Sequence, residues 1–232
     1  MKIFIDPGHN HSGADTGAQG NGLREQDITF YIAKELRDVL SPFAEVMLSR
    51  NDVTDNVGKT LTESINNRAR MANDWQADLF ISIHCNAYAD SRVSGTETLI
   101  YSNKGLDIAA MINNAITADL GTANRGVKIR TDLGVLKQTN MPAVLAETAF
   151  ITNLEDANKL KYRAADFAKA IARAITRYYG LGEFNMVETA QQALKVLQDK
   201  GIINTPEHWE KAVGVVKHFD VLLIKIANAL KG

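Results

Sequence analysis

The chain has 232 residues, enough for one α/β core and a small additional unit. Its 26 Lys and Arg residues and 27 Asp and Glu residues give a formal net charge of −1, which gives no indication of a nucleic acid or an anionic membrane as a partner. Hydrophobic residues make up 45% and charged residues 23%, a balance that excludes a disordered chain. The single cysteine, Cys85, excludes an internal disulfide and a thiolate-rich metal site, so any metal must be held by His and carboxylate ligands.

The sequence predicts neither a secretory leader nor a membrane span. The residues before the turn at Pro7 and Gly8 are too few for the apolar core of a signal peptide. No stretch reaches the 18 or so consecutive apolar residues that a membrane-spanning helix needs. We therefore expect a chain that is made in the cytoplasm and does not insert into a membrane.

Short apolar runs indicate the strands of a sheet. The first covers residues 2–6 and ends at the turn signal Pro7-Gly8. The others cover residues 44–49, 79–84, 96–101 and 143–147. Several are apolar at consecutive positions, as in strands that are covered on both faces.

Segments with helical spacing of apolar residues alternate with these strands. They cover residues 28–40, 61–73, 108–120 and 164–179, and Gly180 ends the last of them. Alternating strands and helices predict an α/β fold with a mostly parallel, doubly wound sheet flanked by helices. We expect this domain to span residues 1–180.

A small C-terminal helical domain is predicted over residues 186–232. Its first helix is stopped by Gly201, a second begins at Thr205-Pro206, and a third carries apolar residues from Phe219 to Leu230. Three short helices are marginal as an independent domain. Three roles stay open for them: targeting to an external partner, self-association into a homo-oligomer, and packing on the first domain.

Candidate catalytic residues fall where predicted strands end. His9 follows the first strand, His84 ends the strand at 79–84, and Glu147 ends the strand at 143–147. Ligands of open α/β sheets bind at the carboxyl ends of the strands. Glu25 follows the Gly-rich loop 13–23, which can fold back over the same edge.

Two imidazoles and one carboxylate are the protein ligands of a catalytic zinc with one position open for water, and a second carboxylate can take the proton of that water. His9, His84, Glu25 and Glu147 supply this set. Their spacing alone leaves a second interpretation open for each His, a surface or hydrogen-bonded imidazole, because no HExxH helix fixes two ligands together.

The sequence resembles a known family in a series of motifs that appear in order between residues 2 and 179. They are FIDPGHN, GADTGAQGNGLREQD, NRARMANDWQADLFISIHCNA, GTETLIY and NRGVKIRTDLGVLKQTNMPAVLAETAFITN. The family is that of the zinc-dependent N-acetylmuramoyl-L-alanine amidases, also called amidase type 3. The resemblance implies that His9, Glu25 and His84 hold Zn²⁺ and that Glu147 is the catalytic carboxylate.

The implied reaction is hydrolysis of the amide between N-acetylmuramic acid and L-Ala of the stem peptide in peptidoglycan. The alternatives are a non-catalytic cell-wall-binding protein and a zinc amidase or peptidase with a different substrate. The intact set of four residues favours the enzyme. Because no leader is predicted, a wall hydrolase is expected to reach its substrate after release by lysis or by a holin-type route. Endolysins and autolysins are released in this way. For such an enzyme, the external partner of the C-terminal helices would be the wall, which is the wall-targeting role.

Other polar residues are interpreted as supporting ones. Asp6 is either an acceptor that orients an imidazole or a cap of the Pro-Gly turn, and Asp15 is interpreted as a turn residue of its loop. Arg50 and Arg68 are predicted to form structural ion pairs.

Two neighbours of His84 receive different interpretations. Asn86 lies on the same face of the strand as His84 and is a candidate substrate contact, with a purely structural role as the alternative. Cys85 points to the opposite face and is expected in the core.

Overall fold

The computed structural model describes residues 1–182, 190–205, 209 and 219–230. The chain contains two compact units, Met1–Gly182 and Glu183–Gly232. Among the described residues, no helix is both long and apolar enough to span a lipid bilayer.

The first unit is built on a six-stranded sheet with the order β4-β1-β5-β8-β6-β7. Strands β4, β1, β5 and β8 run parallel to one another, whereas β6 is antiparallel to β8 and parallel to β7. The bounds are β1 Lys2–Pro7, β4 Glu45–Leu48, β5 Leu79–Asn86, β6 Thr96–Ile100, β7 Asn124–Ile129 and β8 Ala143–Phe150. A separate two-stranded ribbon joins β2 (Gln19–Gly20) to β3 (Leu23–Arg24). The predicted α/β fold with a mostly parallel sheet is confirmed.

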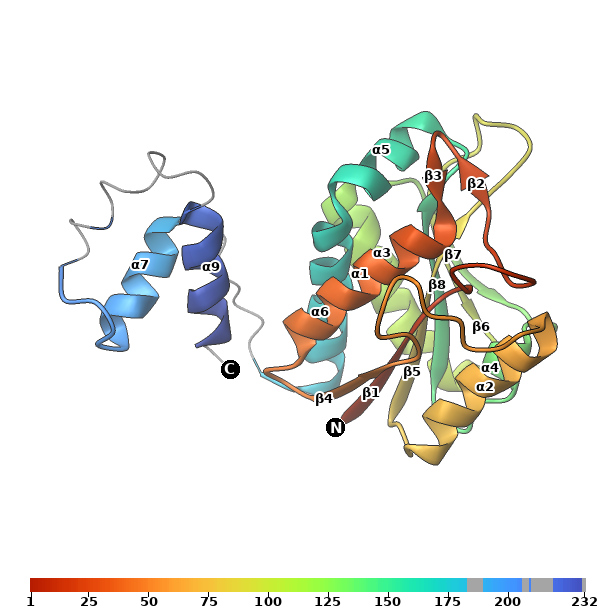
Figure 1. Ribbon diagram of the computed structural model, residues 1–232, viewed down its shortest axis with the longest axis horizontal. Helices are drawn as coiled ribbons and strands as arrows, with labels where there is room; N and C mark the ends of the chain where they lie inside the picture. Colours follow the sequence, from red (N-terminus) through yellow and green to blue (C-terminus); the bar gives the residue numbers. More distant parts are fainter. Residues whose placement is uncertain (183–189, 206–208, 210–218, 231–232) are drawn as a thin grey trace. The chain divides into compact units, whose positions relative to one another are not determined.

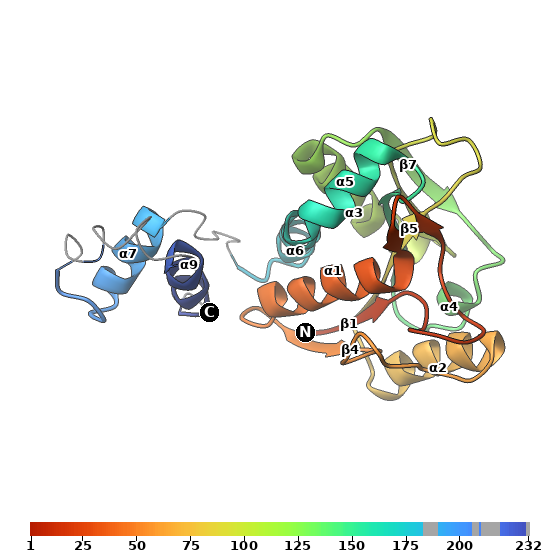
Figure 2. The same cartoon turned by 45° about the horizontal axis from the view of Figure 1, so that its top comes forward.

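Helices cover both faces of this sheet (Figures 1 and 2). One face carries α1, α3 and α6, and the other carries α2 and the short α4. The helix α5 continues from β8 into α6, and the single turn η1 follows β6. Their bounds are α1 Glu25–Leu40, α2 Leu61–Asp74, η1 Asn103–Gly105, α3 Leu106–Leu120, α4 Gly134–Lys137, α5 Leu154–Tyr162 and α6 Ala164–Tyr179.

The core on the α2–α4 face determines which side chains reach the site. Phe4, Phe80 and Leu145 belong to one buried cluster with residues of α2 and α4. Because side chains alternate between the faces of a strand, the polar residues two and four positions further along these strands lie on the same face. They are Asp6, Ser82, His84 and Glu147. The apolar residues of each strand pack in the core and thereby fix the position of the polar residues at the carboxyl end of the same strand.

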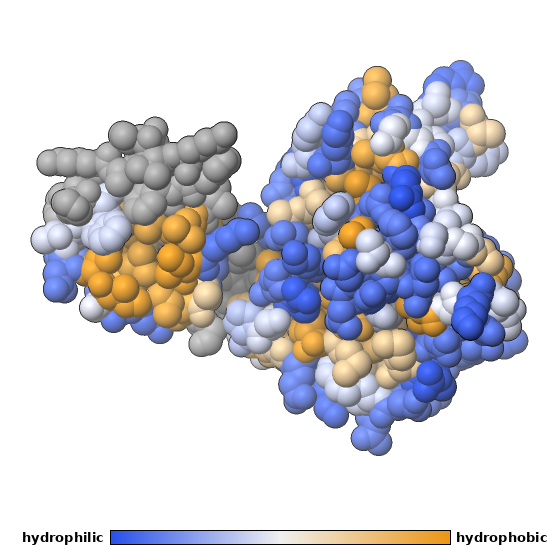
Figure 3. Space-filling model, viewed as in Figure 1, coloured by the Kyte–Doolittle hydropathy of each residue, from blue (hydrophilic) through white to orange (hydrophobic). Residues whose placement is uncertain are grey.

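The second unit contains α7 (Ala190–Asp199) and α9 (Phe219–Ala229). Their contact is an apolar cluster of Ala193, Leu194, Leu197, Ile203, Leu223 and Ala227. Gly201, in the left-handed region with φ 69°, follows α7 as predicted. The predicted helix beginning at Thr205-Pro206 lies outside the described residues. Apolar side chains also gather on the surface of this unit (Figure 3), where Ile202, Leu222 and Ile226 are exposed. Its role stays a prediction.

Candidate metal centre

His9 stands on the turn that follows β1, and its backbone has a positive φ of 66°. A non-glycine residue adopts this conformation only where its surroundings require it. Arg68, buried on α2, supplies that requirement: its guanidinium donates to the carbonyl oxygens of Pro7, at 2.7 Å, and His9, at 2.6 Å. The helix α2 thereby fixes the direction in which the His9 imidazole points.

Glu25 is the first residue of α1 and is buried. Its backbone N–H donates to the carbonyl oxygen of Ala18 at 2.9 Å, and its Oε2 accepts from the backbone N–H of Ala18 at 2.8 Å. Its Oε1 accepts from the backbone N–H of Cys85 at 3.0 Å. The Gly-rich loop and β5 together hold the carboxylate in one orientation.

The imidazole of His84 packs directly on the backbone of Gly8. A Cβ at Gly8 would lie 2.4 Å from Nε2 of His84, which is closer than any side chain permits. A Cβ at Gly17 would likewise lie 2.7 Å from Oε2 of Glu25 and from Cδ2 of His9. Glycine at these two positions leaves the room that the three side chains occupy.

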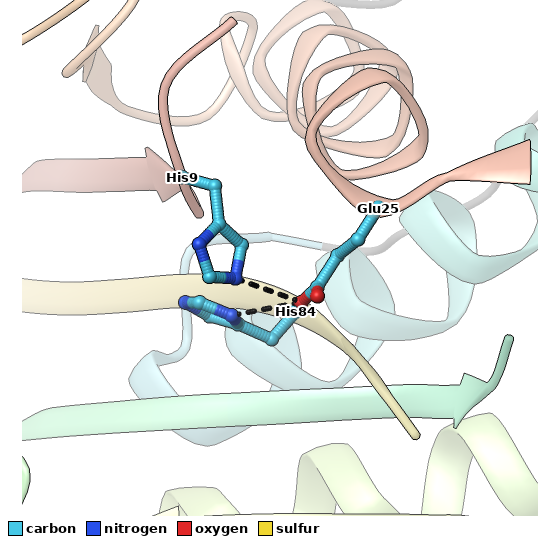
Figure 4. A group of neighbouring side chains, drawn as sticks. All are labelled: His9, Glu25 and His84. Atoms are coloured by element: carbon cyan, nitrogen blue, oxygen red, sulfur yellow. Dashed lines mark hydrogen bonds and ion pairs between the residues drawn. The ribbon is translucent and has the colours of Figure 1, made fainter. Parts of the chain in front are cut away.

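The three side chains converge on one point (Figure 4). Oε1 of Glu25 lies 3.2 Å from Nε2 of His9 and 3.0 Å from Nδ1 of His84, and the three potential ligand atoms all lie within 4.8 Å of one another. Two ligands of a tetrahedral zinc at about 2.0–2.1 Å are roughly 3.3 Å apart. The donor types and their spacing therefore fit a zinc ion.

Electrostatics couple these groups strongly. Burial alone would raise the pKa of Glu25, but hydrogen bonds and charge from His84 and His9 hold it well below its usual range. Burial would lower the pKa of His9, but Asp15 and Glu25 raise it to about 9. The carboxylate is thus ionised at neutral pH, as a metal ligand must be, and a metal must displace a proton from His9.

Glu147 ends up beside His84, because the two residues are register partners on the parallel strands β5 and β8. Within the described part of the chain, the buried Oε2 of Glu147 has no hydrogen-bond partner. Burial, with the charges of Glu25 and Glu97 adding to it, raises the pKa of Glu147 to about 7. The group is poised to gain and lose a proton near neutral pH.

Asp15 has a role that its sequence interpretation missed. Its Oδ1 lies 3.0 Å from Nδ1 of His9, and its Oδ2 accepts from the hydroxyl of Ser64. Asp15 is therefore an acceptor that orients an imidazole rather than merely a turn residue of a polar loop.

Two of the supporting residues, Asp6 and Arg50, make contacts other than those predicted from the sequence. Asp6 does not contact an imidazole: the described residues around its carboxylate are Arg68, Ser49 and Ser82. The predicted structural ion pair of Arg68 is confirmed in its contact with Asp6. Arg50 instead donates to backbone carbonyl oxygens, among them that of Gln26 at 2.8 Å. Cys85 is buried, as predicted.

Two imidazoles at the carboxyl ends of strands, a carboxylate at the start of α1 and another acid on the next strand form the donor set of a metal-dependent hydrolase. The profile of the N-acetylmuramoyl-L-alanine amidases matches residues 3–177, and the chain belongs to this family. It is accordingly an enzyme of peptidoglycan cleavage.

Individual relatives agree with this assignment. The sporulation-specific N-acetylmuramoyl-L-alanine amidase of Bacillus subtilis is 36% identical over 203 residues, covering 85% of this chain and 74% of that protein. The amidase LytC of the same organism is 40% identical over 184 residues, covering 76% of this chain and 35% of LytC. The structure of the amidase AmiC2 of Nostoc punctiforme superposes with a TM-score of 0.69 at 31% identity, covering 78% of this chain and 97% of that chain.

Proposed function

We propose that this amidase uses zinc held by His9, Glu25 and His84 to hydrolyse the amide between the lactyl group of N-acetylmuramic acid and L-Ala. The observation that carries the proposal is the convergence of the three ligand atoms beside Oε2 of Glu147, a buried oxygen without a hydrogen-bond partner among the described residues. An amide carbonyl is a poor electrophile and neutral water is a poor nucleophile, so the reaction needs assistance for both. A zinc ion held by these three residues would supply Lewis-acid activation of both the attacking water and the carbonyl group.

The residues of the chain have separate tasks. Glu147 accepts the proton of the attacking water and delivers it to the leaving amine of L-Ala, for which its pKa of about 7 is suited. Asp15 keeps His9 in the tautomer whose Nε2 faces the ion. Arg68 holds the backbone of His9 from the opposite side.

The test separates zinc binding from proton transfer. The wild-type chain and Glu147→Gln are each measured for zinc per chain by atomic absorption and for cleavage of a muramyl peptide. We expect both to hold zinc, and the variant to lose about two to four orders of magnitude in kcat. Glu45→Gln makes the same chemical change at the exposed start of β4, at the amino ends of the parallel strands and so far from the metal centre, and should leave kcat unchanged. Near-normal turnover by Glu147→Gln would remove Glu147 from this role.

Digestion of purified cell wall distinguishes the remaining alternatives. An amidase of this specificity releases new L-Ala amino termini without new reducing ends. A wall-binding protein without activity releases neither, and a peptidase that acts further along the stem releases other amino termini.

A further inference from the structure

A second pocket opens at the same edge of the sheet, beyond Glu147 as seen from the metal centre. It has a volume of about 380 Å³ and lies among β5, β6, β7 and the segments next to them. Its lining includes Asn86, Tyr88, Glu97, Arg125, Lys128 and Phe150. The metal centre does not use these residues, and their chemistry indicates a ligand of its own.

The pocket carries an excess of positive charge. Oε2 of Glu97 accepts from Nε of Arg125 at 3.0 Å and from Nζ of Lys128 at 2.6 Å, so one carboxylate lies between two cations. The Lys128 and Arg125 side chains keep 45% and 35% of their surface exposed, whereas that of Glu97 keeps only 11%. An ammonium has three donors and a guanidinium five, so Lys128 and Arg125, which both line the pocket, keep further donors even though Nη1 of Arg125 also donates to the carbonyl oxygen of Ser94 at 3.4 Å.

The sheet register places this charge within reach of the reaction. His84 is the register partner of Glu147, and Glu147 is the register partner of Glu97, so the three lie in one row across neighbouring strands. Each step between strands is about 4.7–4.9 Å. An extended peptide advances about 3.3–3.6 Å per residue. A group one or two residues past a scissile bond held between His84 and Glu147 therefore reaches Glu97 and the cations of β7.

The opposite side of the metal centre has a different character. A pocket of about 160 Å³ there is lined by His9 and His84 and by aliphatic residues, and also by Asp15 and the already paired Asp6 and Arg68. The aliphatic residues are Leu61, Ile65, Leu133, Val135 and Leu145. An ionised carboxylate is costly to bury among aliphatic side chains, whereas the methyl groups of a lactyl or acetamido substituent fit them. The two pockets thus orient a substrate that is apolar on one side of the scissile amide and anionic on the other.

We propose that Lys128 and Arg125, held by Glu97, bind the free carboxylate of the stem-peptide residue that follows L-Ala. The occupant is defined by its chemistry: a carboxylate on the stem peptide just past the scissile amide, which a neutral amide at the same position does not match. The inference rests on the proposed function and assigns it a preference, namely for stems in which this carboxyl group is ionised. Charge-assisted hydrogen bonds to an anion carry the preference, since an amide cannot replace the charge.

Two substrates that differ only in this group test the proposal: N-acetylmuramoyl-L-alanyl-D-glutamate with its γ-carboxyl group blocked as the methylamide, and the D-isoglutamine counterpart blocked in the same way. For the zinc-loaded wild-type chain we expect KM for the acid to be lower by about tenfold, with similar kcat, as one charged hydrogen bond predicts. Lys128→Gln should raise KM for the acid toward the value for the amide, with Arg125 keeping part of the preference, and leave KM for the amide unchanged. The matched control, Lys104→Gln, removes an exposed lysine at the opposite edge of the sheet and should keep the wild-type preference.

Calorimetric binding of L-Ala-D-Glu and L-Ala-D-isoGln, each with its γ-carboxyl group blocked as the methylamide, to the full chain gives a readout that does not need turnover. We expect tighter binding of the acid by the wild type and a smaller difference between the two dipeptides in Lys128→Gln. Equal KM and equal affinity for acid and amide in the wild type would overturn the inference while leaving the amidase activity established. Failure to cleave either muramyl peptide, with normal binding of the acid, would instead count against the proposed function alone.

Discussion

His9 presents its two ring nitrogens to two different carboxylates: Nδ1 lies 3.0 Å from Oδ1 of Asp15, and Nε2 lies 3.2 Å from Oε1 of Glu25. One carboxylate belongs to the metal group, while the other lies behind the ring. The contact with Asp15 fixes the tautomer and the plane of the imidazole in the metal-free protein.

Asp15→Asn is therefore expected to weaken zinc binding by about 10- to 100-fold, because an amide is a weaker acceptor for the His9 N–H. Competition with a chromogenic chelator measures the affinity. Asp38→Asn, an equal change at a carboxylate that is 53% exposed on α1, serves as the control and should retain wild-type affinity. Unchanged zinc affinity in Asp15→Asn would show that the contact does not support the metal centre.

Gly8→Ala should disrupt the metal centre from its backbone side. The added Cβ would lie 2.4 Å from Nε2 of His84, so the imidazole must move away from Glu25. We expect zinc content after dialysis to fall, with the free energy of unfolding of the metal-free protein reduced by about 1–3 kcal/mol. Zinc titration and urea unfolding measure the two effects, and full zinc retention would contradict the steric argument.

The buried pair of Asp6 and Arg68 predicts a pH dependence of stability. Burial alone would raise the pKa of Asp6, but Arg68 and the hydroxyl groups of Ser49 and Ser82 outweigh burial and lower the pKa below its usual value of 3.8. A group whose pKa is lower in the folded state contributes stability above its unfolded pKa, and that stability is lost as the pH falls through its folded pKa.

Urea unfolding of the metal-free chain at pH values from 6 down to about 3 tests this linkage. We expect Asp6→Asn to lose about 3–5 kcal/mol at neutral pH, as when one partner of a buried pair is removed, and to show a shallower decline toward acid. Asp74→Asn, whose carboxylate is 66% exposed in its pair with Arg70, should follow the wild-type curve. Parallel curves for Asp6→Asn and the wild type would refute the assignment.

Cys85 is expected to be chemically inert in the folded protein. The thiol is buried beside Thr148, and burial raises its pKa well above the usual value. Because the thiolate is the reactive form, a thiol reagent should label the native chain slowly and the urea-unfolded chain at once. Cys85→Ala should keep zinc content and amidase activity, and rapid native labelling would contradict the burial argument.

Apolar patterning was sufficient to predict most of the sheet. The runs at 2–6 and 79–84 became central strands because they are apolar at nearly every position and are covered on both faces. The strand β7 was missed because it is an edge strand with largely exposed residues, so Asn124 and Arg125 carry no hydrophobic signal. Backbone pairing with the neighbouring strand holds such an edge strand in the sheet, so its own side chains need not show an apolar pattern.

The candidate site was predictable where the fold rule applied and less so in loops. His84 and Glu147 could be placed at one edge because parallel strands end together. Asp15 could not, because a polar residue in a Gly-rich loop has the composition of a turn. Its position six residues after His9, within a loop that must return to Glu25, was the available signal. The distinction between Asp6 and Asp15 depends on where Arg68 of α2 lies, which only tertiary structure reveals.

Because β6 runs antiparallel to β8, the hydrolytic residues and the proposed stem-binding residues come from different segments of this hydrolase. The turn after β1, the strands β5 and β8 and the start of α1 hold the hydrolytic residues, whereas β6 and β7 run in the opposite direction and carry the residues proposed to bind the stem peptide. Substitutions in residues 88–128 can therefore retune which wall chemistry is accepted without disturbing the ligands at 9, 25 and 84. In this fold, substitutions can therefore change substrate selectivity without changing catalytic activity.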